Sequence, residues 1–187
     1  MAKHWYGYGA QEGGRDSHFA NGKYAVFPGG NLPEHLRPFT EGAFRLNGGT
    51  GSASAVMPTY SILWKQDPSG EQVGGAFSEW LIQEKLRRKA GFDGVVCTDW
   101  GVTLDNSGVD YTGGGEPWGV EGLTVAERHY RVFLAGCDQI GGSNAAEPVR
   151  EAFLRIPTWI RRRRSRPSAI PVSWRKVTRR RSVPSSY

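Results

Sequence analysis

The run GVVCTDW at residues 94–100 is the feature that most limits how this chain can fold. Its apolar residues follow one another without the polar alternation of a sheet that faces water on one side. Such a run is typical of a parallel strand buried on both faces, and parallel strands need crossover segments, usually helices. The run therefore predicts an α/β fold. It ends in Asp99 and Trp100, where the strand meets a long glycine-rich loop at residues 101–122.

The segments around this run alternate between strand and helix patterns. The pattern predicts strands at 52–60 and 137–142 and helices at 77–91 and 124–136. Thr124 and Glu127 have the spacing of a capping box at the start of the second helix, and Gly136 ends it. Such alternation predicts a parallel sheet, either doubly wound or an arc of a TIM barrel. Both place their chemistry at the carboxyl ends of the strands.

Charge divides the chain into two parts. Residues 155–187 hold ten arginines and one lysine without an acidic residue, whereas the whole chain has a net charge of +6, so residues 1–154 are net negative. The first part is predicted to be one folded domain. The Arg/Ser/Pro-rich second part is predicted to be a basic tail that is solvated or docked on a partner. A basic arm that binds RNA, DNA or anionic lipid is the alternative.

Sequence-specific nucleic-acid recognition by the tail is not expected. Pro167 and Pro171 separate the arginine runs at 161–164 and 179–181, so no continuous helix can present both runs to one groove.

The remaining composition bears on location and on metal binding. Cys97 and Cys137 lie in short apolar stretches, which favours buried thiols over a disulfide or a metal pair. The chain has no run of 18 apolar residues and no apolar signal region in its first residues, so we expect no membrane span and favour a cytoplasmic location. Its four histidines are scattered, and we expect neither a metal centre nor a cofactor. His35 and His129, on helical stretches, are expected to have surface or core roles.

The segment GFDGVVCTDW at residues 91–100 resembles the nucleophile segment of glycoside hydrolase family 3. The resemblance continues, in the family's order, through AKHWYGYG, GRDSHFANGKYAVFPGGNLPEHLRPF, AVMPTYS and LAGCDQIGG, and covers roughly residues 2–150. It implies a glycosidase with a carbohydrate substrate, which hydrolyses β-linked glucosides or short glucans with retention of configuration. The family also includes xylosidases and N-acetylglucosaminidases.

The resemblance assigns roles to single residues. Asp99 matches the nucleophile, and Lys3, His4 and Tyr60 match residues that bind the sugar. Trp100 would offer a flat apolar face to the sugar ring. From the residues alone, core packing of Trp100 or Tyr60 and a solvated Lys-His end remain alternatives.

The general acid has several candidates. GRDSH resembles the Asp-Ser-His motif of the family's N-acetylglucosaminidases, which makes His18 the acid/base and Asp16 the residue that orients it. Glu116, Glu121 and Asp105 in the loop after the Asp99 strand are weaker candidates.

The resemblance covers only the last three to four βα units of the family's (β/α)8 barrel. We therefore expect an α/β fold that forms a partial TIM barrel, with open strand edges and an uncovered apolar face. Assembly into a homo-oligomer would complete it. The alternative function is a non-catalytic remnant that binds carbohydrate or serves assembly, with a tail that binds a polyanion.

Overall fold

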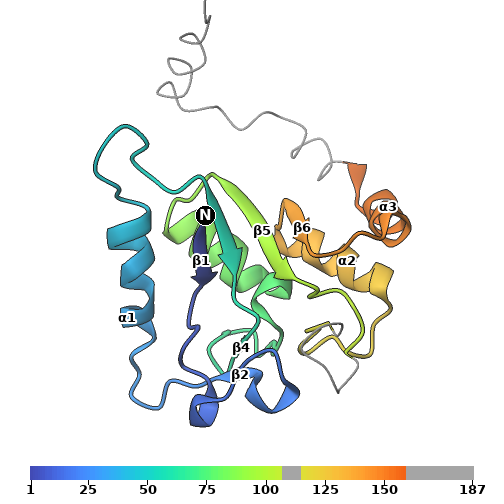
Figure 1. The fold of residues 1–187 in the computed structure, drawn as a ribbon, viewed down its shortest axis with the longest axis horizontal. Helices are drawn as coiled ribbons and strands as arrows, with labels where there is room; N and C mark the ends of the chain where they lie inside the picture. Colours follow the sequence, from blue (N-terminus) through green and yellow to red (C-terminus); the bar gives the residue numbers. More distant parts are fainter. Residues whose placement is uncertain (107–114, 159–187) are drawn as a thin grey trace, which may run out of the picture.

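A computed structural model describes residues 1–106 and 115–158 (Figure 1). The strands are β1 (Ala2–Trp5), β2 (Tyr24–Ala25), β3 (Ala55–Pro58), β4 (Ile62–Leu63), β5 (Val95–Trp100) and β6 (Gln139–Gly141). The α-helices are α1 (Leu32–Arg37), α2 (Val125–Ala135) and α3 (Ala146–Arg155). Helical segments of π type span Pro38–Ala43 and Trp80–Lys89, and 3₁₀ turns span Glu12–Gly14, Ala20–Gly22 and Gly75–Phe77.

A parallel sheet forms the centre of the described chain. Its four strands lie in the order β1-β3-β5-β6, and β2 and β4 form a separate parallel pair. Ala55 pairs with Val95 and Val56 with Val96, which fixes the register of β3 against β5. Figure 1 shows α1 beside β1 and α2 beside β6, with α3 outside α2. The predicted parallel α/β fold is confirmed, whereas the partial barrel stays a prediction.

The main core lies between this sheet and the helical segment Trp80–Lys89. Trp5 and Val56 are fully buried and pack in one cluster with Leu81 and Leu86 from that segment. The Trp5 indole Nε1 donates to the Leu81 carbonyl at 3.1 Å, so the largest buried side chain also satisfies its polar atom.

Helix α2 has the boundaries that its sequence predicts. The Thr124 hydroxyl accepts from the Glu127 amide, and the Glu127 carboxylate accepts from the Thr124 amide, which is a complete capping box. Gly136 ends the helix in the left-handed conformation, with φ of 112°. Arg128 and His129 are buried on this helix, and His129 bonds the Val125 carbonyl at 2.7 Å. The core role is therefore confirmed for His129.

The other predicted elements are confirmed with shifted ends. The helix predicted at 77–91 begins at Trp80 and ends in a wider turn, where the Ala90 amide donates to the Lys85 carbonyl at 3.0 Å.

The two cysteines, Cys97 and Cys137, are buried free thiols, as predicted. In the described ranges, no helix has the length and apolarity that a membrane crossing needs. The cytoplasmic location stays a prediction.

The predicted domain boundary near Leu154 falls inside α3. This helix continues to Arg155, and Ile156 after it is 1% exposed and packs with Phe133 and Ala152. Most of the predicted basic tail, residues 159–187, lies outside the described residues, as does part of the glycine-rich loop, residues 107–114. The two-part division of the chain stays a prediction.

Removing the capping box should weaken the fold. The Thr124→Ala variant leaves the Glu127 amide without its acceptor at the start of α2, so we expect the free energy of unfolding to fall by about 1 kcal/mol. Denaturant unfolding measures this loss. Thr50→Ala, in an exposed loop, is the control and should change the free energy by less than about 0.5 kcal/mol. Equal losses in the two variants would contradict the role of the cap.

Candidate active site

The carboxyl ends of β1, β3 and β5 bring three predicted residues together. Asp99 lies near the end of β5, His4 lies on β1, and Tyr60 follows β3. His4 Nε2 is 3.1 Å from Asp99 Oδ2, a close polar contact that lacks the angles of a directed hydrogen bond. Because parallel strands end at the same edge of a sheet, residues 95 positions apart in the sequence meet at one site.

The surroundings of Asp99 favour its ionised form. Its side chain is almost fully buried, and burial raises the pKa of Asp99. The His4 side chain, the Trp100 amide and the Tyr60 hydroxyl together outweigh burial and hold the pKa of Asp99 below its ordinary value. The Trp100 amide donates to Oδ1 at 2.8 Å. Oδ2 accepts no hydrogen bond within the described residues, so this oxygen is available to contact a bound molecule.

Tyr60 and Trp100, which are joined by a hydrogen bond, lie next to Asp99 in the chain or in space. The Tyr60 hydroxyl donates to the Trp100 carbonyl at 2.8 Å, and burial together with the nearby Asp99 charge raises the pKa of Tyr60. Tyr60 therefore stays a neutral donor at physiological pH. Trp100 is 62% exposed, so its side chain does not pack in the core.

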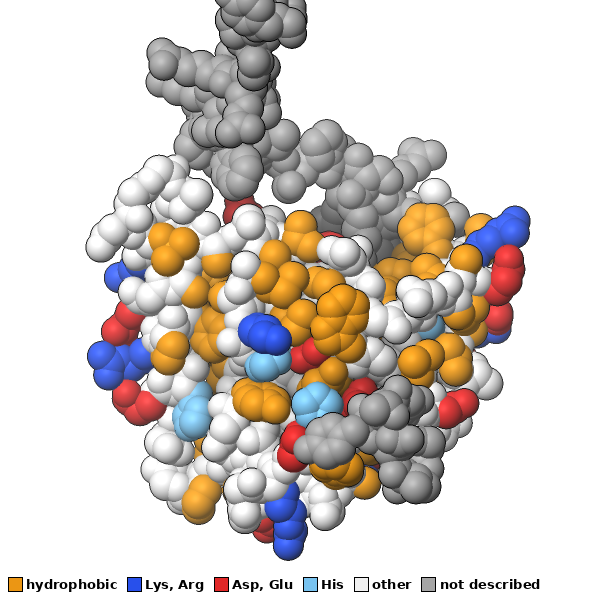
Figure 2. All heavy atoms as spheres, viewed as in Figure 1, with side chains coloured by type: hydrophobic (Ala, Val, Ile, Leu, Met, Phe, Trp, Pro, Cys, Tyr) orange, Lys and Arg blue, Asp and Glu red, His pale blue; other side chains and the backbone are white. Residues whose placement is uncertain are grey.

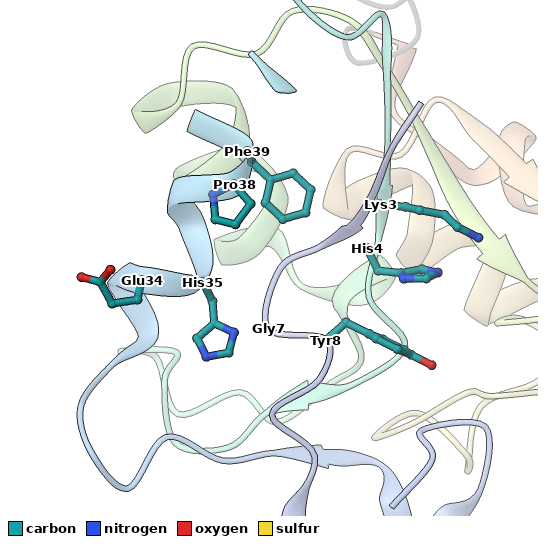
Figure 3. A pocket seen from close by; sticks show the side chains of 8 residues that line it. All are labelled: Lys3, His4, Gly7, Tyr8, Glu34, His35, Pro38 and Phe39. Carbon is teal, nitrogen blue, oxygen red and sulfur yellow. The ribbon is translucent and has the colours of Figure 1, made fainter. Parts of the chain in front are cut away.

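A cavity of about 340 Å³ lies on the β1 side of this site (Figure 3). It is lined by Lys3, His4, Gly7, Tyr8, Glu34, His35, Pro38 and Phe39. Figure 3 shows Lys3, His4 and Tyr8 pointing away from the helix that carries His35. The His4 and Tyr8 rings lie 4.5 Å apart between centroids, so Tyr8 fixes the imidazole that contacts Asp99. Asp99 itself does not line the cavity.

The predicted Asp-His pair also reaches the site. Asp16 Oδ1 and His18 Nδ1 are 2.7 Å apart, and the His18 ring lies 4.8 Å from the Tyr60 ring between centroids. Gly22 packs beneath this loop, where an added Cβ would overlap the Asp16 carbonyl. Both side chains are about one-third exposed, 36% for Asp16 and 37% for His18.

The three weaker acid candidates have different surroundings. Glu121 forms an ion pair with Lys23 at 2.9 Å, and Asp105 is 78% exposed and pairs with Arg128 at 2.7 Å. Glu116 is half-buried and interacts electrostatically with Asp99, Asp16 and His18. The structure therefore brings one of these three acids to the Asp99 site.

The histidines form no metal centre within residues 1–106 and 115–158, where no three His, Cys, Asp or Glu side chains come close enough to hold an ion. His35 packs edge-on against Phe27, with ring centroids 5.2 Å apart, and lines the cavity beside His4.

Curated relatives match most of this chain but only part of their own length. A periplasmic β-glucosidase/β-xylosidase of Dickeya chrysanthemi is 46% identical over 155 residues, which are 76% of this chain and 23% of the relative. A probable β-glucosidase C of Aspergillus oryzae is 41% identical over 152 residues, 80% of this chain and 22% of the relative. A β-hexosaminidase of Neisseria meningitidis is 32% identical over 164 residues, 83% of this chain and 37% of the relative.

The resemblance to glycoside hydrolase family 3 is confirmed. No protein-family model matches the chain. Among solved structures, a β-glucosidase from Erythrobacter marinus aligns with a TM-score of 0.60 and 22% identity, and it covers 87% of this chain and 18% of that one. A fungal family 3 β-N-acetylglucosaminidase aligns with a TM-score of 0.56 and 22% identity over 81% of this chain and 16% of that one. These two solved structures show that the described part of the chain has the same kind of fold as part of those enzymes.

Sequence reasoning missed the residues that hold the site's loops. The Trp118 indole Nε1 donates to the Ser17 carbonyl at 2.7 Å, a contact across 101 positions that ties the loop after β5 to the Asp16–His18 loop. Tyr8 against His4 and Gly22 under Asp16 were also missed. The aromatic residues in YGYG and EPWG were visible signals, because large aromatic side chains usually pack against other groups.

Substitution at Gly22 should disturb the Asp16–His18 loop. In the Gly22→Ala variant the new methyl group overlaps the Asp16 carbonyl, so the loop must shift, and we expect unfolding free energy to fall by about 1–3 kcal/mol. Gly29→Ala is the matched control, since a Cβ there meets no atom within 4 Å. Denaturant unfolding of both variants measures the difference. If Gly22→Ala is as stable as Gly29→Ala, the close packing is not a constraint.

Proposed function

We propose that this chain supplies the nucleophile and sugar contacts of a retaining glycosidase that acts on β-linked glucosides or short glucans. The observation that carries the proposal is the surroundings of Asp99: an ionised, buried carboxylate at a strand end, with His4 3.1 Å from one oxygen and an exposed indole next in the chain. The chain spans 23% of the length of its Dickeya relative, so the activity is inferred for the part that it matches.

The geometry of Asp99 suits nucleophilic attack. One carboxylate oxygen accepts the Trp100 amide, which orients the group, while Oδ2 faces His4. In the first step Oδ2 would bond to the anomeric carbon as the glycosidic oxygen leaves. In the second step water would displace Asp99 from the same carbon, with retention of configuration.

The neighbouring side chains suit sugar binding. Lys3 and His4 donate toward hydroxyl groups, and the neutral Tyr60 hydroxyl lies beside Trp100. The 62% exposed Trp100 face can stack on the C–H groups of a pyranose ring. The non-catalytic alternative, a carbohydrate-binding or assembly module with a polyanion-binding tail, predicts binding without turnover.

Loss of the Asp99 carboxylate should abolish turnover. We expect Asp99→Asn to lower the hydrolysis rate of a chromogenic β-glucoside by on the order of 10³-fold or more per folded molecule, because the covalent step is removed. A 2-deoxy-2-fluoro-glucoside should label wild-type Asp99, as peptide mass analysis can show. Asp93→Asn, an exposed acid in the same segment, is the matched control and should keep full activity. If Asp99→Asn hydrolyses the glucoside at the wild-type rate, Asp99 is not the nucleophile.

We also propose that the chain self-associates to complete a partial (β/α)8 barrel. Within the described residues, β1 and β6 are the edge strands of the four-stranded sheet. Figure 2 shows hydrophobic side chains gathered on the face of the molecule that also carries lysine and histidine side chains. Val95 is 42% exposed and lies four residues before Asp99 on β5, about 13 Å away on the same face. A second copy could therefore cover Val95 and leave Asp99 open to substrate.

A charge placed on this face should weaken self-association. We expect the wild-type chain to scatter light as a dimer or larger species at micromolar concentration, and Val95→Glu to shift it toward the monomer. Leu46→Glu is the control, because Leu46 is exposed to the same degree, 43%, but lies in the loop before β3 and not on β5. A monomeric wild type, or equal shifts in both variants, would contradict the proposed assembly.

A further inference from the structure

The loop that follows β5 returns a second carboxyl group to the site. The Gly115 amide donates to the Asp105 carbonyl at 2.8 Å, and Asn106 Nδ2 donates to the Gly115 carbonyl at 2.7 Å. These bonds join the outgoing and returning parts of the loop directly before Glu116. Gly115 is required there, since an added Cβ would overlap the Leu104 carbonyl.

The other side of Glu116 is held as firmly. The Trp118 amide donates to the Glu116 carbonyl at 2.8 Å, and the Trp118 indole, 1% exposed, bonds the Ser17 carbonyl. Glu116 is therefore fixed between two anchors, one on the exit from β5 and one on the Asp16–His18 loop. The backbone at Glu116 therefore needs little ordering when a substrate binds.

The surroundings of Glu116 are the opposite of those of Asp99. Its Oε2 is buried and accepts no hydrogen bond within the described ranges. Burial raises the pKa of Glu116, His18 opposes this, and the negative charges of Asp99 and Asp16 raise it further, to about 7. Two neighbouring carboxyl groups thus differ, because Asp99 is ionised at neutral pH whereas Glu116 still holds a proton in part of the molecules. This is the division that acid-base catalysis at a glycosidic bond requires.

We propose that Glu116 is the general acid/base that works with Asp99, an inference that rests on the proposed glycosidase function. In the first step a bond forms between Asp99 Oδ2 and the anomeric carbon, the bond from that carbon to the leaving oxygen breaks, and the Glu116 proton moves to that oxygen. In the second step water bonds to the anomeric carbon, its proton moves to Glu116, and the bond to Asp99 breaks. The two steps together consume one glycoside and one water, and they return Asp99 and Glu116 to their starting states.

His18 and Asp16 then act as positioning residues. Both are about one-third exposed and contact each other through Nδ1 and Oδ1. Because His18 opposes the rise in the pKa of Glu116, it favours the carboxylate that the second step needs. Glu121 and Asp105 pair with Lys23 and Arg128, and these ion pairs suit neither for proton donation.

Leaving-group dependence tests this role. Phenyl β-glucoside needs a proton on its leaving oxygen, whereas 2,4-dinitrophenyl β-glucoside does not. We expect Glu116→Gln to lose about 10²–10⁴-fold in kcat/KM on the phenyl substrate and less than about tenfold on the dinitrophenyl substrate. Azide should restore turnover of the dinitrophenyl substrate and yield β-glucosyl azide, since azide needs no general base.

Variants at His18 decide between the two acids. If His18→Gln shows the leaving-group pattern and azide rescue while Glu116→Gln does not, the acid is His18 and the inference is overturned. Equal losses on both substrates in Glu116→Gln would also overturn it, because a structural defect does not distinguish leaving groups. If the wild type hydrolyses neither substrate and its Asp99 takes no label, the proposed function itself fails, and the acid role with it.

A stability measurement checks the surroundings of Glu116 independently of activity. Because the pKa of Glu116 is raised, the stability that its protonated form contributes is full below its ordinary pKa of 4.5 and is lost as pH rises through about 7. Glutamine does not ionise, so the Tm of Glu116→Gln should gain on the wild type between pH 5 and pH 9. The Glu12→Gln variant, an exposed control, should show no such gain. A pH-independent difference for Glu116→Gln would overturn the assignment.

Discussion

Parallel pairing of β1, β3 and β5 is the constraint on which the site depends. The Thr59 amide bonds the Trp5 carbonyl at 2.7 Å, and Val56 pairs with Val96, so the carboxyl ends of all three strands lie at one edge. A slip of one residue in β5 would turn Asp99 toward the helices and Val96 toward the opposite face. The contact between His4 and Asp99 is therefore a product of strand register, and neither side chain could establish it alone.

Hydrogen bonding and burial then give two similar carboxyl groups different protonation. The Trp100 amide and the His4 contact stabilise charge on Asp99, although the group is almost fully buried. Glu116 has no comparable donor to its buried oxygen in the described part of the chain, and the Asp99 charge makes its ionisation harder still. Ionisation of Asp99 thus helps to keep the proton on its neighbour.

The sequence predicted the elements whose signals are local. The unbroken apolar run predicted β5, and the capping-box spacing with Gly136 predicted α2, because both depend on neighbouring residues. It also identified Asp99, His4, Tyr60, Asp16 and His18 as site residues, and the structure brings them to one edge of the sheet. Their catalytic and binding roles stay predictions. Sequence patterns could not rank Glu116 above Glu121 and Asp105. Glu121 pairs with Lys23 and Asp105 with Arg128, and both partners are distant in sequence. The position of Glu116 depends on how Trp118 holds the folded loop.

The pinned ends of the loop after β5 have a consequence for protein engineering. The Asp105 carbonyl and the Gly115 amide are joined at 2.8 Å, and the buried Arg128 bonds Asp105 and the Glu121 carbonyl from outside the loop. These bonds hold the two flanking ends together independently of the residues that connect them. Each doubling of loop length costs only about 0.6 kcal/mol in closure entropy. This position is therefore a suitable graft point for engineered segments.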